Sequence, residues 1–242
     1  MKRLITLVVG FLPASTLKNT LLRWLGHEIA RTASIAPVVL LGNKHLIVGD
    51  GARIGPFNVF RSLEVVSVGA WSEIGQFNWI SAAPFLVEAS SSTIAGTFSL
   101  GVHSSLTSRH YLDASGGIDI EEFVTVAGVR SVFMSHGIDV ADNVLDSVPI
   151  RIERYAMLGG SCSLVMGATV PAHSVVAMGS VVTRGLDTPH ALYAGVPARF
   201  KKLVPAGNYS TRTHGAVPAR PKDPLKAPPA EEDPASVTGR RV

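Results

Sequence analysis

One histidine stands where the regular pattern of this sequence is interrupted. His136 lies in SVFMSHGIDVADNVLDSVPIR, residues 131–151, after an apolar run. An imidazole, whose ordinary pKa is about 6.5, can accept a proton at neutral pH, so we interpret His136 as a general base. Asp113 or Asp139 could orient its other ring nitrogen, and a backbone carbonyl would serve equally. The chemistry predicted here is removal of a proton from an acceptor group.

A predicted turn of two glycines and a serine follows this segment. Gly159, Gly160 and Ser161 form a corner that exposes backbone N–H groups. Such groups stabilise an oxygen that becomes negative during a reaction, and a backbone N–H of the Gly160–Ser161 corner is the simplest donor for that task. Cys162, the only cysteine, has no acid or base beside it in sequence and is interpreted as a packing residue. A reducing compartment is the simplest expectation for such a chain.

The elements that hold these residues are indicated by an unusual period. Leu158, Leu164, Val170, Val176 and Val182 occupy every sixth position, which fits neither the helical period nor the alternation of a strand. Six residues can form one short extended side and a corner, and three such sides close a coil of about eighteen residues. The pattern therefore predicts a β-solenoid in which Leu158 and Val176 stack on each other.

The same phase continues through most of the chain. The predicted interior positions upstream are Val48, Ile54, Phe60, Val68, Ile74, Ile80, Ile94, Leu100, Leu106, Leu112, Ile118, Ile120, Val126, Val132 and Ile152. The phase slips by two at Val66/Val68, Ile118/Ile120 and Ile150/Ile152, where slightly longer coils are expected. Residues 83–93 fit poorly and predict a second irregular loop beside the one at 133–151. We expect an all-β domain over residues 34–204.

The two ends of the chain differ from this domain. Residues 1–33 are predicted to form an amphipathic helical cap with an apolar face between a Ser15/Thr16 cap and Gly26, made by Leu17, Leu21, Leu22 and Leu25. This cap should cover the first coil, and its basic residues leave contact with an anionic membrane surface as an alternative. Residues 1–15 also resemble a short signal peptide, although no run is long enough to span a membrane. Residues 205–242 are proline-rich and predict a flexible tail.

Together, several segments resemble the hexapeptide-repeat acyltransferases. They are the repeats, the Ser-His-Gly-Ile-Asp segment, YAMLGGSCSLVMGATVPAHSVVAMGSVVTR and YAGVPARFKK, within residues 34–202. The likeness is greatest to the O-acetyltransferases of bacterial polysaccharide and sugar-modifying pathways. It implies a left-handed parallel β-helix, a trimer with active sites at subunit boundaries, and acetyl-coenzyme A as the usual donor. The single cysteine excludes a cysteine-cluster site, and we expect no metal. The sequence departs from the family pattern where Glu121 and Glu153 follow aliphatic ladder residues.

The resemblance also suggests roles for further residues. His136 resembles the family's catalytic histidine, and Ala177, Met178 and Ser180 would line the cofactor groove. Coenzyme A carries several phosphate charges, so its far end should meet basic residues on later coils. The residues expected there are Thr183, Arg184, Pro197, Arg199, Lys201 and Lys202. The acceptor, a sugar or glycan, could contact Arg109, His110 and Tyr111.

Rival functions make different demands. A β-helical carbonic anhydrase would need His103, His110 and His136 to converge on one metal ion, and their spacing supplies no close pair. A non-enzymatic solenoid scaffold would not need His136 or a cofactor-binding end. Nucleic acid is not an expected partner, because no basic stripe interleaved with aromatics is present. We expect a cytoplasmic acetyltransferase, with the inner face of the membrane as an alternative place and with hydroxyl and amine acceptors, and acetyl and longer acyl donors, both open.

Overall fold

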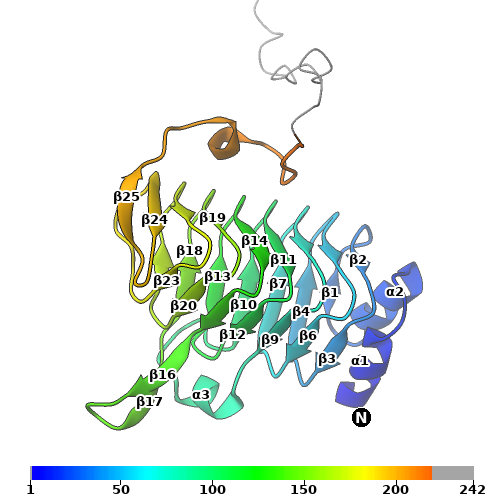
Figure 1. Cartoon of the computed structure of the whole chain (residues 1–242). Helices are drawn as coiled ribbons and strands as arrows, with labels where there is room; N and C mark the ends of the chain where they lie inside the picture. Colours follow the sequence, from blue (N-terminus) through cyan, green and yellow to red (C-terminus); the bar gives the residue numbers. More distant parts are fainter. Residues whose placement is uncertain (1, 220–242) are drawn as a thin grey trace, which may run out of the picture.

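A computed structural model describes residues 2–219, and its main body is a three-sided, left-handed parallel β-helix (Figure 1). Side A contains β1 (Glu28–Ile29), β4 (His45–Val48), β7 (Val65–Val68), β10 (Thr97–Leu100), β13 (Ile118–Ile120), β18 (Ile150–Ile152) and β21 (Thr169–Val170). Side B contains β2 (Ser34–Ile35), β5 (Arg53–Ile54), β8 (Glu73–Ile74), β11 (Ser105–Ser108), β14 (Thr125–Val129), β19 (Met157–Leu158), β22 (Val175–Val176), β24 (Ala191–Ala194) and β25 (Arg199–Leu203). Side C contains β3 (Val39–Leu41), β6 (Val59–Arg61), β9 (Trp79–Ser81), β12 (Tyr111–Asp113), β15 (Val132–Met134), β20 (Ser163–Val165) and β23 (Val181–Val182). The fold class predicted from the period of six is confirmed, although the solenoid begins at Glu28 rather than at residue 34.

The predicted ladder forms the core, with two exceptions. Leu158 pairs with Val176 in parallel register, as expected. Val132 is only half-buried, and Phe133 takes the interior position because the pairing of β11 with β14 shifts its register and the coil gains a residue. Ile94 also lies outside the core, in the loop before β10, where Phe98 is buried instead. Both errors come from local changes in coil length.

The corners of the solenoid use left-handed backbone conformations, most of them at residues other than glycine. At the edge between sides A and B, consecutive coils place an aromatic ring at this position, at His103, Phe123, Tyr155, His173 and His190, with φ between 52° and 59°. Neighbouring rings are stacked with centroids 4.4 to 5.0 Å apart. Stacking of rings from successive coils compensates for part of the cost of positive φ in L-residues.

Two helices, rather than one, cover the first coil. They are α1 (Lys2–Gly10) and α2 (Thr16–Trp24), and the Ser15 side chain caps α2 as predicted, with its Oγ accepting from the Lys18 N–H at 3.2 Å. The predicted apolar face is only partly correct, because Leu22 is fully buried whereas Leu17 is exposed. No helix among residues 2–219 is long and apolar enough to cross a membrane.

Both predicted loops leave the solenoid at the edge between sides C and A. The first includes α3 (Pro84–Ala89), and the second forms an antiparallel hairpin of β16 (His136–Asp139) and β17 (Val144–Ser147). They touch, with 2.9 Å between the hydroxyl oxygens of Ser90 and Ser147. The two insertions therefore build one protrusion on this edge (Figure 1).

The C-terminal part closes the solenoid and then turns back along it. β24 and β25 pair antiparallel at the end of side B. The following segment contains a short 3-10 helix, η1 (Asn208–Thr211), and the Tyr209 hydroxyl donates to the Ala156 carbonyl at 3.3 Å. The Arg212 guanidinium lies 3.9 Å from the centroid of the Tyr209 ring. Residues 205–219 of the predicted tail thus pack on the A–B edge, and residues 220–242 lie outside the described residues.

Candidate functional site

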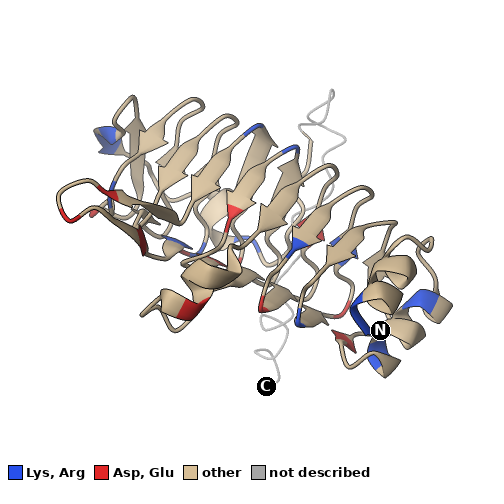
Figure 2. Cartoon of the chain, turned by 90° about the horizontal axis from the view of Figure 1, so that it is seen from below, with Lys and Arg blue, Asp and Glu red and all other residues tan. Residues whose placement is uncertain are grey.

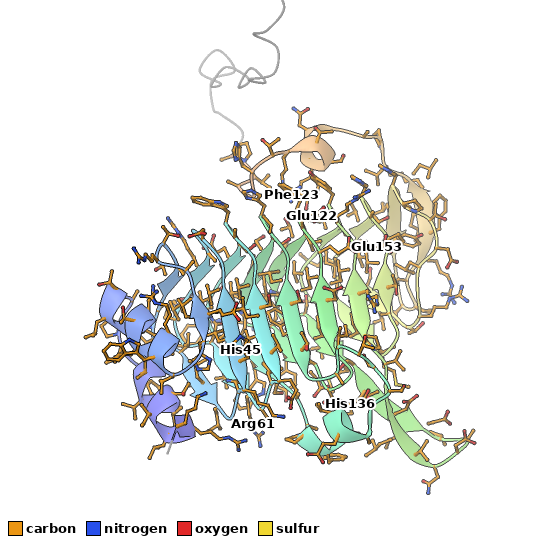
Figure 3. The ribbon with its side chains drawn as sticks, turned by 180° about the vertical axis from the view of Figure 1, so that it is seen from behind. His45, Arg61, Glu122, Phe123, His136 and Glu153 are labelled. Carbon is orange, nitrogen blue, oxygen red and sulfur yellow. The ribbon has the colours of Figure 1, made fainter. Side chains whose placement is uncertain are left out.

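His136 forms a short hydrogen bond with Asp113 at the C–A edge. β15 ends just before it, and β16 begins with it, so the side chain stands at the base of the hairpin (Figure 3). Its Nδ1 is 2.7 Å from Oδ1 of Asp113, and the side chain keeps 25% of its surface exposed. A carboxylate only accepts hydrogen bonds, so Nδ1 carries the proton and Nε2 of the neutral ring is left as an acceptor.

Asp113 is itself held in one position. It ends β12, which pairs with β15 so that Asp113 lies beside Met134. Its carboxylate accepts from the backbone N–H and the hydroxyl of Ser115, both at 3.1 Å, and from the hydroxyl of Ser135 at 3.3 Å. This carboxylate is buried and fixed by three donors besides the imidazole, so it orients the ring of His136 rather than following it.

Asp139 occupies a different environment, although it is closer to His136 in sequence. Its Oδ1 accepts from the backbone N–H groups of Ala141 and Asp142 at 2.9 and 3.2 Å. These bonds close the turn between β16 and β17, at the far end of the hairpin from His136. Of the three groups considered as partners of the imidazole, the structure places Asp113 there.

The acceptor-binding residues expected from sequence are divided by the fold. Arg109 and Tyr111 are exposed, with the Arg109 guanidinium 5.7 Å from the centroid of the Phe77 ring and the Tyr111 ring stacked on Trp79. His110 is buried, and this removes it from any contact with an acceptor. The sequence could have shown this. His110 precedes the inward Leu112 by two residues, and residues two apart on a strand lie on the same face.

In the interior, His110 forms hydrogen bonds that connect neighbouring coils. Its Nδ1 accepts from the Ser131 N–H at 3.0 Å, and its Nε2 lies 2.9 Å from the hydroxyl of Thr107. Its backbone N–H donates to Oδ1 of Asn78 at 2.9 Å. Burial lowers the pKa of this imidazole to about 4, so the ring is neutral and joins neighbouring coils.

The glycine corner lies on another edge of the solenoid. Gly159, Gly160 and Ser161 connect β19 on side B with β20 on side C, whereas His136 stands between sides C and A. The Ser161 N–H donates to the Val129 carbonyl at 2.8 Å, so it is not free to bind an oxyanion. The structure therefore separates this corner from His136 of the same chain.

The predicted groove residues of the next coil do meet the glycine corner. The Gly179 N–H donates to the Gly160 carbonyl at 3.0 Å, and a Cβ on Gly159 would lie 2.6 Å from the Met178 nitrogen. Met178 is exposed, and Ala177 is half-buried. Ser180 is buried, with its Oγ accepting from the Gly195 N–H at 3.2 Å, which gives it a packing position rather than a surface one.

Two of the predicted basic residues share a cavity. Arg184 and Arg199 line a space of about 180 Å³ together with Asp187. Arg184 follows β23 on the same C–A edge as His136 but two coils further along, roughly 10 Å at the spacing of parallel strands. The other residues expected near this end, Thr183, Pro197, Lys201 and Lys202, are all exposed.

A three-histidine metal site is not assembled in this part of the chain. His103 is on the A–B edge, His110 is in the interior, and His136 is on the C–A edge. In Figure 3 His136 and Phe123, which stacks on His103, lie at opposite edges of the solenoid. Within residues 2–219, no three His, Cys, Asp or Glu side chains lie close enough to share a metal ion.

Comparison with known proteins identifies the fold. No protein-family model and no curated protein sequence matches the chain. AntD, an N-acyltransferase from Bacillus cereus solved as a variant in complex with dTDP and coenzyme A, is 16% identical over 65% of this chain and 84% of that chain, with a TM-score of 0.50. A hexapeptide-repeat-containing acetyltransferase from Vibrio cholerae is 22% identical over 57% and 74%, with a TM-score of 0.47. A maltose O-acetyltransferase from Clostridium difficile 630 is 18% identical over 58% and 70%, with a TM-score of 0.45. The similarity to AntD, at a TM-score of 0.50, supports the fold alone.

Proposed function

We propose that this protein is an acetyltransferase that moves an acetyl group from acetyl-coenzyme A to a hydroxyl group of a sugar or polysaccharide precursor. The observation that carries the proposal is the pair formed by Asp113 and His136, at 2.7 Å, on the edge from which both insertions protrude. A scaffold protein has no need of a buried carboxylate that fixes a half-open imidazole. Since acetyl-coenzyme A is a cytosolic metabolite, we place the reaction in the cytoplasm.

The Asp113–His136 pair supports a route for each proton of the proposed reaction. Nε2 of His136 accepts the hydroxyl proton of the acceptor as its oxygen attacks the thioester carbonyl, so a C–O bond forms. The tetrahedral intermediate then expels the sulfur as the C–S bond breaks, and the imidazolium returns its proton to the thiolate. Asp113 accepts from Nδ1 throughout and stabilises the imidazolium between the two steps. The products are an acetyl ester and free coenzyme A.

The cavity lined by Arg184 and Arg199 at the C-terminal end is our candidate for binding the phosphates of the donor. Arg184 and Arg199 approach it from different elements, the end of side C and β25. Guanidinium groups bind phosphate with paired N–H donors. With His136 on the same edge as Arg184, an extended pantetheine arm running along that edge would connect the two.

A second copy of the chain would complete the site. The glycine corner and Met178 are on the B–C edge, so one chain cannot bring them to its own His136, whereas a neighbouring chain packed against side C could. Several side chains on the outer surface of side C are apolar, among them Leu41, Trp79, Tyr111, Val132 and Val165. We therefore propose a trimer with active sites between subunits, in which the Gly160 N–H of the neighbour is the donor for the oxyanion.

The test of the reaction is product analysis. The purified protein is incubated with acetyl-coenzyme A and a panel of free sugars, nucleotide sugars and lipid-linked glycans, and products are identified by mass spectrometry. An ester, which mild alkali removes, is the expected product, and an alkali-stable amide would assign an amine acceptor instead. Absence of any acceptor-dependent release of coenzyme A across the panel would contradict the proposed function.

Shared sites can be tested by mixing inactive subunits. His136→Ala lacks the base, and Met178→Glu places a negative charge at an exposed position of the proposed groove. If sites lie between subunits, subunit exchange between the two variants should regenerate some intact sites and restore part of the activity. Light scattering gives the oligomer size, and variants that assemble normally but never complement each other would place the whole site within one chain.

A further inference from the structure

The two N-terminal helices turn an apolar surface outward. The exposed side chains of this surface are Leu4, Ile5, Val8, Phe11, Leu17 and Trp24. Trp24 is 81% exposed, which is unusual for the largest apolar side chain. Surface leucines are common singly, but five large apolar residues on two adjacent helices, with Phe11 directly after α1, indicate a binding surface.

The outward orientation is enforced by the polar residues of α2. Lys18 is fully buried, and its ammonium group donates to the carbonyls of Gly10, Leu12 and Ala36 at 2.8, 2.9 and 2.8 Å. Asn19 donates from Nδ2 to the Ala33 carbonyl at 2.8 Å. The Leu12, Ala33 and Ala36 carbonyls thus receive donors that a purely apolar helix face would not supply.

Arg23 completes this inward polar face with a bond from its guanidinium to the Ile29 carbonyl at 3.0 Å. Leu17 directly precedes Lys18 and Trp24 directly follows Arg23. Adjacent residues of a helix are turned by about 100° from each other, so Leu17 and Trp24 are left on the outer side. The exposure of the apolar residues therefore follows from how the solenoid end is capped.

A basic pocket lies beside the apolar surface. It has a volume of about 220 Å³ and is lined by Lys2, Arg3, Thr6, His27, Asn43 and Lys44. Glu64 pairs with Lys44 at 2.7 Å, whereas no ion pair is seen for Lys2 or Arg3 within residues 2–219. Figure 2 shows basic segments around this end of the molecule. The pocket therefore offers two cations that have no carboxylate partner in the described structure.

His27 supplies a buried donor to the same pocket. Its Nδ1 accepts from the Leu46 N–H at 3.3 Å, and burial, with Lys2 and His45 nearby, lowers the pKa of the ring to about 4. In the neutral ring the other nitrogen, Nε2, must then carry the proton. This Nε2 is buried and has no hydrogen-bond partner in the described part of the chain. An unpartnered N–H on a residue that lines the same pocket as Lys2 and Arg3 is suited to an anionic oxygen.

We propose that the N-terminal end of the protein binds the surface of a membrane that contains anionic phospholipids. The apolar side chains of α1 and α2 enter the interfacial region, and the basic pocket receives a headgroup phosphate. Membrane-surface helices combine such an apolar face with flanking Lys and Arg, and neither helix here is long enough to span a bilayer. This inference is independent of the proposed acetyl transfer.

The first test is vesicle binding of the full-length protein. Sedimentation is measured with phosphatidylcholine vesicles and with vesicles that also contain phosphatidylglycerol. We expect binding to the anionic vesicles, weakened by salt, with a blue shift of tryptophan emission that Trp24→Phe removes. Equal binding to both kinds of vesicle, or none, would overturn the proposal.

The apolar contribution has a matched control in the chain. Val8 on α1 and Val217 on the C-terminal segment are each 59% exposed. Val8→Gln should lower vesicle affinity about tenfold, whereas Val217→Gln should leave it unchanged. If the two variants bind equally, the surface on α1 is not the membrane contact. A change of oligomer size in Val8→Gln, together with wild-type vesicle binding, would assign this surface to a subunit contact and refute the proposal.

The pocket is tested by removing one charge inside it and one outside. Arg3→Gln should weaken binding to phosphatidylglycerol vesicles about fivefold or more, at roughly one kcal/mol for each basic residue at an anionic surface. Arg31→Gln removes an exposed charge outside the pocket and should have the smaller effect. Circular dichroism checks folding of both variants, and equal losses would show that net charge alone, without the pocket, attracts the protein.

Discussion

His110 and His136 occupy neighbouring coils, and the fold gives them opposite chemistry. Both ring nitrogens of His110 have protein partners, the Ser131 N–H and the Thr107 hydroxyl. His136 uses only Nδ1, toward Asp113, and keeps part of its ring at the surface. A histidine of this solenoid can therefore accept a proton from a substrate only where one of its ring nitrogens has no hydrogen-bond partner within the protein. His110 points inward along a regular strand, whereas His136 begins an insertion.

The largest effect expected from this difference is on catalysis. His136→Gln should lower turnover by about two to four decades, the usual contribution of a positioned general base, while the free energy of unfolding changes little because the side chain is partly exposed. The measurement is steady-state kinetics with acetyl-coenzyme A beside thermal unfolding. Loss of folding instead of turnover would make His136 a structural residue like His110.

The second expected effect is on stability and its pH dependence, and it concerns His110. Its pKa in the folded protein, about 4, lies below the ordinary value of 6.5, so the unfolded chain binds the proton more tightly. The stability that neutral His110 contributes is present above about pH 6.5 and is lost as the pH falls toward 4, up to about 3 kcal/mol. His27, whose pKa is also about 4, should contribute in the same direction.

The variant His110→Gln tests whether His110 contributes to stability and not to catalysis. His110→Gln should cost about 2 kcal/mol at pH 7, because it leaves buried groups without partners, and should flatten the loss of stability between pH 7 and 4. Urea unfolding at a series of pH values measures both. Turnover per folded molecule should stay close to wild type, and a catalytic defect in a fully folded His110→Gln protein would break the contrast between the two histidines.

A smaller effect is expected when the carboxylate beside His136 is made neutral. Asp113→Asn should keep most of its hydrogen bonds but stabilise the imidazolium poorly. Turnover should therefore fall about tenfold to a hundredfold, less than the two to four decades expected when the base itself is removed. Asp139→Asn is the matched control, since its Oδ1 only closes the hairpin turn, and should change turnover less than about threefold. Equal losses from the two variants would remove Asp113 from its assigned role.

Much of the fold was predictable because the period of six is a local property of the backbone. A coil repeats its inward positions wherever its length is constant, so Leu158 and Val176 could be paired from sequence alone. The two failures, Val132 and Ile94, occur where an extra residue or an insertion changes that length. The sites of both insertions were also readable as interruptions of the same period, and so was the position of His136.

What the tertiary structure decided was which distant groups meet. Asp113 reaches His136 because β12 and β15 pair in register, although Asp139 is nearer along the chain. Register across coils depends on the summed lengths of corners and loops, which no single segment specifies. The same holds for the edges of the solenoid, which place Gly160 away from His136.

The N-terminal cap shows the same limit. The sequence predicted an amphipathic helix between a Ser15/Thr16 cap and Gly26, and α2 with its Ser15 cap lies within those bounds. Only the tertiary structure decided that Lys18 and Asn19 face inward, because the first coil presents the Ala36 and Ala33 carbonyls to their donors. Helix propensity and the period of six determine which helices and strands form. The hydrogen-bond and packing partners in the folded protein determine which side of each element is exposed to solvent.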